Sequence, residues 1–287
     1  MANNKKPKYN EIVFSEEQEK QIIDMYTNQI ISTVKIGNIF NCGNKTIAKV
    51  LEKHNIPRTG VGKRVHSLNE HYFDVIDTPN KAYILGMLYA DGYNCLSKCT
   101  VRLQLQYTDK DILESIRMEL DSKKELNFIR CSDKVSSNGF ISKDMYQLEI
   151  YSSHMCKTLE KLGMVQNKSL VLTFPTFLDS TFYSHFIRGY FDGDGSYCHR
   201  YVGDKYGNSD VITITSTESF CNDCLNIIRQ ETGIGGGIYD ASNHNGITKV
   251  LSISGVNQAN KFFEWLYKDA ELYLKRKHNL YMQFLVA

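Results

Sequence analysis

Two apolar segments of the chain end in the same way, with an aspartate followed by a glycine. One runs from Ile84 to Gly92 and the other from Ile187 to Gly195, so Asp91 and Asp194 stand 103 positions apart. Two carboxylates brought together repel each other, and a divalent cation placed between them and a phosphate relieves that repulsion. Mg²⁺ prefers oxygen ligands. The pair of acids therefore predicts a site for Mg²⁺, or Mn²⁺, at which a phosphate ester could be hydrolysed.

The elements that carry the two acids are predicted to be buried helices, because both segments are apolar nearly all round. One face of each helix would lie on its own sheet and the other against its twin, with Gly86 and Gly189 allowing close approach. Gly92 and Gly195 are expected to end the helices in the left-handed conformation.

An internal repeat surrounds the two acids, because similar elements follow each of them in the same order. Apolar residues alternate along a first strand in each copy, at Val101 to Leu105 and at Ile212 to Ile214. Each strand leads into a helix cap, Thr108-Asp109 or Thr217-Glu218, and then into an amphipathic helix. Later strands at 145–151 and 248–254 also match. The second copy has six extra residues in a hairpin near 203–208, and the first copy has six extra residues in a hairpin near 136–143.

These two segments resemble the signature of the LAGLIDADG homing endonucleases, and the resemblance covers about residues 80–287. It implies an α+β protein in which two αββαββα repeats form a pseudo-two-fold saddle. Three positions depart from the family pattern: Leu85, Tyr89 and Arg188. A long cation beside a buried helix pair must reach solvent or find a partner, so Arg188 is expected to do one of these.

The resemblance also implies an activity and a set of site residues. The activity is sequence-specific, double-strand hydrolysis of DNA, as in a homing endonuclease, with the metal held by Asp91 and Asp194 and by the residues just before them, Ala90 and Gly193. Family members use a lysine near each active site. By position Lys168 fits the first repeat, and Lys275 or Lys277 fits the second, of which Lys277 is our choice.

Polar residues on the strands are expected to line the saddle and to meet base edges in the major groove. They are Arg102, Gln104, Gln106, Gln147, Val211, Thr213 and Thr215. An ordinary solvated sheet face would show the same alternation. Because both repeats lie in one chain and their polar faces differ, we expect a monomer bound to a long, asymmetric double-stranded DNA site.

Residues 14–58 have the pattern of three short helices. The first helix begins with a capping box at Ser15 and has an apolar stripe of Ile22, Ile23 and Tyr26. The second is capped by Ser32 or Thr33 and contains Ile36, Ile39 and Phe40. The third starts at Lys45 and is ended by Pro57. Gly43 is expected to take a positive φ in the turn between the last two helices. The pattern resembles resolvase-type and sigma-factor-type helix-turn-helix domains, although three-helix modules also serve as protein-binding domains.

The charge distribution supports a DNA contact in this part of the chain. Between Lys35 and His66 there are seven basic residues against one acid, whereas from His71 onward there are 23 basic and 25 acidic residues. The third helix would present Asn44, Lys45, Thr46, Ala48 and Lys49 to DNA. The basic residues Arg58, Lys63 and Arg64 would follow a phosphate backbone, unless that segment is a simple hinge.

The expected organisation is a flexible tail (1–13), a helix-turn-helix domain (14–58), a basic linker (59–79) and the two repeats (80–178 and 179–287). No apolar stretch reaches the length of a membrane helix and the N-terminus has no secretory signal. We therefore expect a DNA-associated cytoplasmic protein, encoded by a bacterium or a phage. Cys221-x-x-Cys224 and Cys95-x3-Cys99 could join as zinc ligands, but the first pair lies on an apolar helix face, where cysteine packs as a small hydrophobe.

Two other functions remain open on the same scaffold: a transcription regulator that binds DNA without cutting it, and an RNA maturase. Relatives of the first kind usually lack the metal-binding acids, which are present here. His278-Asn279 is similar to the end of a protein-splicing element, but Leu280 follows it, which argues against a splicing role.

Overall fold

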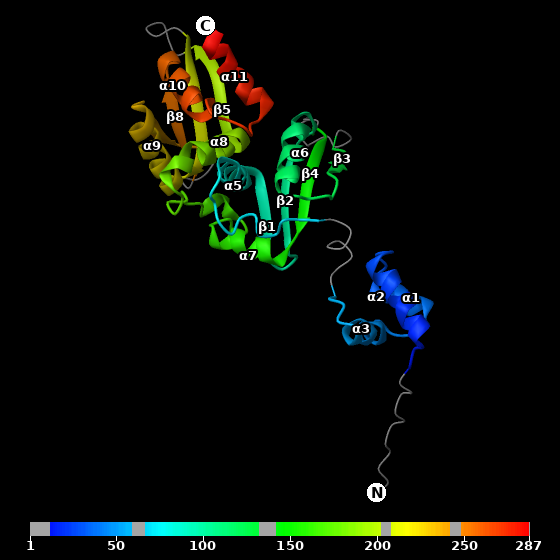
Figure 1. Cartoon of the computed structure of the whole chain (residues 1–287). Coiled ribbons are helices and arrows are strands. Elements are labelled where there is room, and N and C mark those ends of the chain that lie inside the picture. The colour runs from blue at the N-terminus through cyan, green and yellow to red at the C-terminus, as the bar shows by residue number, and fades with distance from the viewer. Residues whose placement is uncertain (1–11, 59–66, 132–141, 202–207, 242–247, 287) are drawn as a thin grey trace. The chain divides into compact units, whose positions relative to one another are not determined.

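The protein is described by a computed structural model that covers residues 12–58, 67–131, 142–201, 208–241 and 248–286 (Figure 1). The chain divides into two compact units, an N-terminal unit (Met1–Leu68) and a C-terminal unit (Asn69–Ala287). The expected tail and the basic segment with Lys63 and Arg64 lie outside the described residues, apart from residues 12 and 13.

The N-terminal unit consists of the helices α1 (Glu16–Thr27), α2 (Thr33–Ile39) and α3 (Asn44–Lys53). Ser15 begins α1 with the predicted capping box, in which its hydroxyl accepts from Gln18 N and its own N–H donates to the Gln18 side chain. Ser32 caps α2, with its side chain accepting from Lys35 N. The three helices enclose a small apolar core of Ile22, Tyr26, Ile36, Ile47, Val50 and Leu51.

The turn between α2 and α3 differs from the prediction. Gly43 has φ −73° and is the N-cap of α3, whereas Asn41 takes the left-handed conformation with φ 50°. The tight contact is made by Gly37, where a Cβ would lie 2.7 Å from Cys42 O. Ile39, expected in the core, is 58% exposed. Asparagine tolerates positive φ, so the turn can place its left-handed residue two positions earlier.

The C-terminal unit contains the predicted αββαββα order twice, which confirms the α+β fold class. The first repeat comprises α5 (Pro79–Asp91), β1 (Gly92–Cys95), β2 (Thr100–Gln106), α6 (Lys110–Glu119), β3 (Asn127–Ile129), β4 (Met145–Tyr151) and α7 (Ser153–Lys161). The second comprises α8 (Tyr183–Asp194), β5 (Gly195–Tyr201), β6 (Asn208–Thr217), α9 (Glu218–Thr232), β7 (Gly237–Asp240), β8 (Thr248–Ser254) and α10 (Val256–Tyr267). A last helix, α11 (Lys275–Val286), follows.

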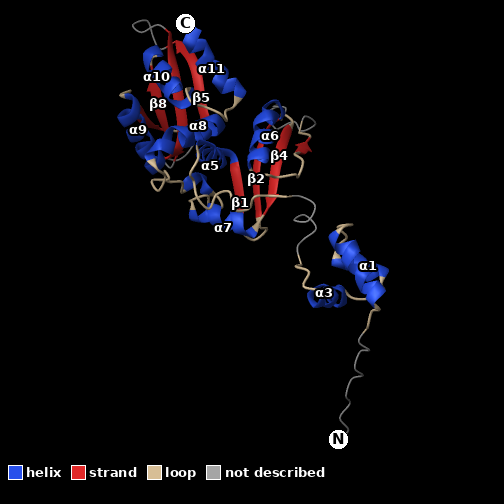
Figure 2. Ribbon diagram, in the orientation of Figure 1, coloured by secondary structure: helices blue, strands red, loops and turns tan. Residues whose placement is uncertain are grey.

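Each repeat forms one antiparallel four-stranded sheet, with the orders β1-β2-β4-β3 and β5-β6-β8-β7 (Figure 2). The central strands of the two repeats pair in the same register, with Val101 opposite Ile150 and Ile212 opposite Ile253. Alternate residues of these strands are buried against helices, as the apolar alternation predicted. The hairpin insertions predicted near 203–208 and 136–143 lie mostly outside the described residues.

The helices α5 and α8 pack against each other between the two sheets (Figure 1). A Cβ on Gly86 would lie 2.1 Å from Phe186 O, and one on Gly189 would lie 2.0 Å from Tyr83 O. Backbone therefore meets backbone at both glycines, as expected. Tyr89 and Phe186 cover the contact edge-on, with ring centroids 5.1 Å apart.

Two details of the helix ends were predicted wrongly. Gly92 and Gly195 are extended, with φ −77° and −76°, and not left-handed. Their positions have no space for a side chain, because a Cβ would lie 2.4 Å from Leu88 O and 2.0 Å from a Phe191 ring carbon. The expected cap at Thr108-Asp109 is instead a short 3₁₀ turn without a side-chain capping bond, whereas Thr217 caps α9 as predicted.

Within the described residues, none of the helices combines the length and the apolar character needed to cross a membrane.

Candidate active site and nucleic-acid interface

The C-terminal ends of α5 and α8 bring the two predicted acids to one place. Asp91 is the last residue of α5 and Asp194 the last of α8. A Cβ on Gly193 would lie 2.4 Å from Ala90 Cβ and 2.9 Å from Asp91 Oδ2. The close helix contact made possible by Gly86 and Gly189 thus continues to the ends that carry the acids.

The two carboxylates are in an unfavourable environment for negative charge. Both residues reach solvent, but enough protein surrounds them that burial raises the pKa of Asp91 to about 6, with the charge of Asp194 as a second cause. Burial also raises the pKa of Asp194. The helix macrodipole adds to the cost, because negative charge is disfavoured at a helix C-terminus. Among the described residues, neither carboxylate has a hydrogen-bond or ion-pair partner.

A lysine lies beside each acid, half-buried at Lys168 and buried at Lys277. Lys168 Nζ donates to Ala90 O and to Gly92 O, each at 2.9 Å. Lys277, 4% exposed, donates to Gly195 O at 2.6 Å and to Phe191 O. Gly92 and Gly195 are equivalent positions of the two repeats, so the two amines occupy related places.

The lysines and the acids influence one another. Burial lowers the pKa of Lys277 to about 8 and lowers that of Lys168, while both aspartates act in the opposite direction. The structure therefore brings together all four of the predicted catalytic side chains. Lys275, the alternative, is exposed and pairs with Asp111 on α6.

The backbone positions predicted to contribute to the metal also lie here. The carbonyl of Ala90 accepts from Lys168, so a cation at this oxygen would share it with the amine. Gly193 lies against Asp91. A set of carboxylate and carbonyl oxygens fits Mg²⁺ or Mn²⁺, and it does not fit a soft metal.

Sequence reasoning missed a buried polar cluster beneath the site. Asp192 is fully buried and accepts from Tyr83 Oη at 2.8 Å, Tyr267 Oη at 2.5 Å and Leu274 N at 2.7 Å. It lies two residues before Asp194, so it faces a different side of α8. The sequence Asp-Gly-Asp-Gly at 192–195 could have indicated this cluster, because two acids two residues apart on one helix point to different sides.

Arg188 belongs to the same buried region and, of the two outcomes expected for it, finds partners instead of reaching solvent. Its side chain is 0% exposed and donates to Leu272 O at 3.0 Å and Leu266 O at 2.9 Å. It also lies over the Tyr83 ring, with Cζ 5.2 Å from the centroid. The guanidinium joins α8 to the segment before α11, which carries Lys277, and so helps to place that lysine.

The polar faces of the two sheets contain most of the residues predicted to meet DNA. Arg102 and Gln104 are half-buried on β2, and Arg102 pairs with Glu149 of β4 at 2.7 Å. Glu149 therefore holds the Arg102 side chain in place. This acid was not identified from the sequence. The other half-buried or exposed members of the set are Gln106, Gln147, Thr213 and Thr215.

Val211 is an exception, because it is 1% exposed and does not present its side chain to solvent. Strand alternation assigned it to the polar face, but the folded unit buries it. Its predicted contact with DNA is not available in this structure.

On α3 of the N-terminal unit, Asn44, Lys45 and Lys49 are exposed and Thr46 is half-buried. Ala48 was predicted to face outward but is only 8% exposed, since it follows Ile47 on the side of the helix that meets the core. Arg58 is exposed, whereas Lys63 and Arg64 lie outside the described residues.

The cysteines predicted as alternative zinc ligands do not gather. Cys221 and Cys224 are buried on α9, and Cys95 and Cys99 lie in the hairpin of β1 and β2. In the described part of the chain, the one group of three metal-ligating side chains is His71, Asp74 and His154.

Comparison with known proteins gives similarity over parts of the chain. No family model matches it. A stretch of 114 residues, 40% of the chain, is 31% identical to the DNA-directed RNA polymerase subunit Rpo1C of Methanocaldococcus jannaschii, and the chain spans only 12% of that relative's length.

Among solved structures, the chain is similar to full-length DUF199/WhiA from Thermatoga maritima, with a TM-score of 0.46 and 15% identity, over 76% of this chain and 64% of that one. It is also similar to the LAGLIDADG homing endonuclease I-GzeII in complex with its DNA target, with a TM-score of 0.48 and 12% identity, over 73% and 89% of the two chains. A third is the LAGLIDADG homing endonuclease I-LtrWI bound to target DNA, with a TM-score of 0.46 and 12% identity, over 76% and 90%.

Proposed function

We propose that the C-terminal unit is a DNA endonuclease that depends on a divalent cation, and that the N-terminal unit helps it to select its site. One observation carries the proposal. Asp91 and Asp194 lie together, reach solvent and have no partner among the described residues, although burial raises the pKa of both. Partnerless carboxylates in such surroundings are suited to hold a cation.

Asp91 and Asp194 would hold Mg²⁺ or Mn²⁺, which would supply a Lewis acid and a positive charge for the developing transition state. The chain's own contribution is to hold Asp91 and Asp194 at the ends of two helices that cannot separate. The resulting site is preorganised, so little reorganisation accompanies the reaction.

Each lysine would exchange a proton with water or donate to a phosphate oxygen. A charged ammonium has three N–H donors, and two backbone carbonyls occupy two of them at Lys168 and at Lys277. The third would donate to a phosphate. In a neutral amine the same two carbonyls would take both N–H groups and leave the lone pair free as a base, which suits Lys277 with its pKa of about 8.

DNA would lie along the polar faces of the two sheets, next to the acids. Gln104, Gln147, Thr213 and Thr215 offer the amide and hydroxyl groups that read base edges, and Arg102 would leave Glu149 to contact a guanine or a phosphate. Because the two faces differ, we infer that one chain binds an asymmetric site. On α3, Lys45 and Lys49 would contact phosphates beyond it.

The proposal is tested by incubating the purified full-length chain with a library of random double-stranded DNA and selecting the bound sequences. We expect the selected DNA to be cut on both strands when Mg²⁺ or Mn²⁺ is present and to remain intact with EDTA. The rate should be first order in protein, because one chain contains both acids. It should also rise with pH between about 5 and 7, since protons compete with the cation for Asp91, whose pKa is about 6.

Specific binding without cutting under any of these conditions would contradict the nuclease and favour the alternative, a DNA-binding regulator. Preferential binding of RNA in the same selection would favour the maturase. A rate that is second order in protein would contradict the monomer.

The role of the N-terminal unit makes a separate prediction. Deleting residues 1–66 should shorten the DNase footprint and weaken binding at least about tenfold, while the C-terminal unit stays folded, because the two units have separate cores. In the full chain, replacing Lys45 and Lys49 by Ala should lower the slope of log affinity against log salt by about 2, because each lysine would neutralise one phosphate.

Lys20→Ala is the matched control, since Lys20 is an equally exposed lysine on α1 that lies outside the proposed contact helix. An unchanged footprint after the deletion, or an equal decrease in affinity for Lys20→Ala, would show that this unit binds something other than the DNA.

A further inference from the structure

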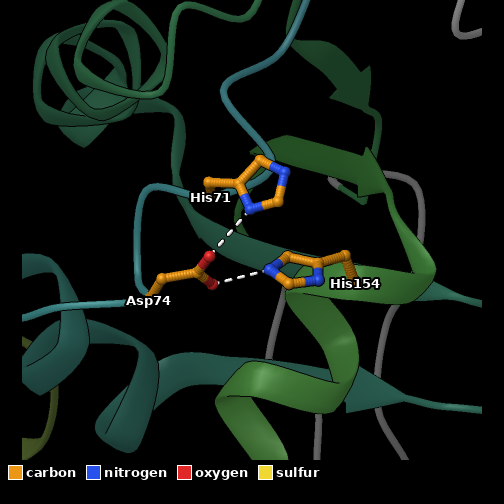
Figure 3. Close-up of side chains that lie close together, drawn as sticks. All are labelled: His71, Asp74 and His154. Atoms are coloured by element: carbon orange, nitrogen blue, oxygen red, sulfur yellow. Dashed lines mark hydrogen bonds and ion pairs between the residues drawn. The ribbon is translucent and has the colours of Figure 1, made fainter.

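Three side chains of the C-terminal unit converge at a place separate from the two acids (Figure 3). His71 Nδ1 lies 2.7 Å from Asp74 Oδ2, and His154 Nε2 lies 2.6 Å from Asp74 Oδ1. The two imidazole rings are 4.3 Å apart, and all three ligand atoms lie within 4.8 Å of one another.

The backbone that carries these side chains is firmly placed. His71 and Asp74 flank Tyr72 and Phe73, which are 5% and 1% exposed. Tyr72 Oη also donates to Glu119 on α6 at 2.9 Å. The turn is closed by Asp74 N, which donates to His71 O at 3.0 Å. The pair therefore projects from an anchored turn.

The third side chain comes from the first turn of α7, which is equally well anchored. Met155 and Cys156, the residues after His154, are fully buried. Ser152 caps the helix and donates to Glu70 Oε2 at 2.7 Å. A second bond thus ties α7 to the segment that carries His71, so the three ligands keep their spacing.

We propose that His71, Asp74 and His154 bind a transition-metal dication such as Zn²⁺. Two imidazole nitrogens and one carboxylate oxygen are a common set of ligands for zinc, and imidazole distinguishes this site from the oxygen-only site at Asp91 and Asp194. The three side chains are 66%, 38% and 42% exposed, so water can complete the coordination.

The geometry needs only a small change to accept the ion. Ligand atoms around a tetrahedral zinc with bonds of 2.0–2.1 Å stand about 3.3 Å apart. The atoms are now 2.6 and 2.7 Å apart in hydrogen bonds to the carboxylate. Rotation of the exposed side chains would open this spacing, with the protons of the two N–H groups displaced by the metal.

A metal here would fasten residues 69–75 to α7. These residues are the first of the C-terminal unit and connect the N-terminal unit to the first repeat. The ion would act as a structural clamp at the entry of the chain into the repeats. It is independent of the proposed nuclease chemistry, which uses other residues.

The test is a titration of the full-length chain with Zn²⁺, in millimolar Mg²⁺ to fill the acid site and with the thiols kept reduced. We expect one bound Zn²⁺ to disappear, or its affinity to fall at least about 100-fold, in His71→Ala and in His154→Gln. Glutamine can still donate to Asp74, so this variant keeps the hydrogen bond while removing the ligand. Zinc should raise the melting temperature of the parent protein by about 5 °C and that of the variants by less.

His199→Ala is the matched control, because His199 makes a similar bond to Asp210 at 2.8 Å and belongs to no such group of three among the described residues. It should keep the affinity of the parent. Bound Co²⁺ should lack the near-ultraviolet band of thiolate ligands. Equal zinc affinity and stoichiometry in the parent, His71→Ala and His154→Gln would overturn the proposal, as would a Co²⁺ spectrum with thiolate bands that persists in both variants.

Discussion

Replacing Asp91 by Asn should abolish DNA cleavage, with a decrease in rate on the order of 10³-fold or more. The amide keeps the shape of the carboxylate but not the charge that would hold a divalent cation, and a metal's contribution of several kcal/mol to a transition state corresponds to a factor of this size. Asp194→Asn should behave in the same way, because the two acids occupy equivalent helix ends.

Folding should survive these substitutions, and the free energy of unfolding should rise. Asp91 has a folded-state pKa of about 6, above its ordinary value of 3.8. The folded protein therefore holds this proton more tightly than the unfolded chain does. The group's stabilising contribution is present at low pH and is lost as the pH rises from about 4 to about 6. At pH 7 asparagine removes that unfavourable charge.

The measurements are cleavage rate, DNA affinity in Ca²⁺ and the midpoint of chemical unfolding at pH 7. Affinity should stay within a few-fold, because phosphate and base contacts elsewhere supply it. Asp269→Asn, at an exposed acid after α10, is the control and should cut normally. A variant at either acid that cuts at the parent rate would show that the catalytic centre lies elsewhere.

Gly86→Ala should destabilise the C-terminal unit by about 3 kcal/mol or more. The new Cβ would lie 2.1 Å from Phe186 O and 2.9 Å from Tyr190 N, both backbone atoms of α8 that cannot rotate away. Overpacking of this kind costs about 1–3 kcal/mol or more. Here the added methyl group would require a whole helix to shift. The cost of that shift exceeds the gain of about 1 kcal/mol that alanine brings within a helix.

Gly189→Ala should have a similar effect, since its Cβ would lie 2.0 Å from Tyr83 O. Any folded fraction should cut slowly, because the same shift would move Asp91 away from Asp194. Chemical unfolding followed by fluorescence measures the first effect. Gly235→Ala is the control, with only one atom, 3.5 Å away, near its Cβ. Equal stability of Gly86→Ala and Gly235→Ala would contradict the backbone contact.

Local patterns were sufficient to predict much of this protein. The repeat of Asp-Gly at 91–92 and 194–195, with strand alternation after each copy, predicted two matching units with the same order of elements. Ser15 and Thr217 were identified as helix caps from residue type and position. Such features depend on neighbours within a few residues or on a fixed period, so they can be seen in one chain.

Only the tertiary structure decided the environment of each side chain. It buried Val211 and Ala48, which alternation and helical spacing had placed outside. It selected Lys277 over Lys275 as the amine beside the site. It also joined His71 and Asp74 to His154, about 80 residues later. Burial, pKa and ligand geometry depend on atoms from distant segments, and those atoms come together only when the helices and sheets pack.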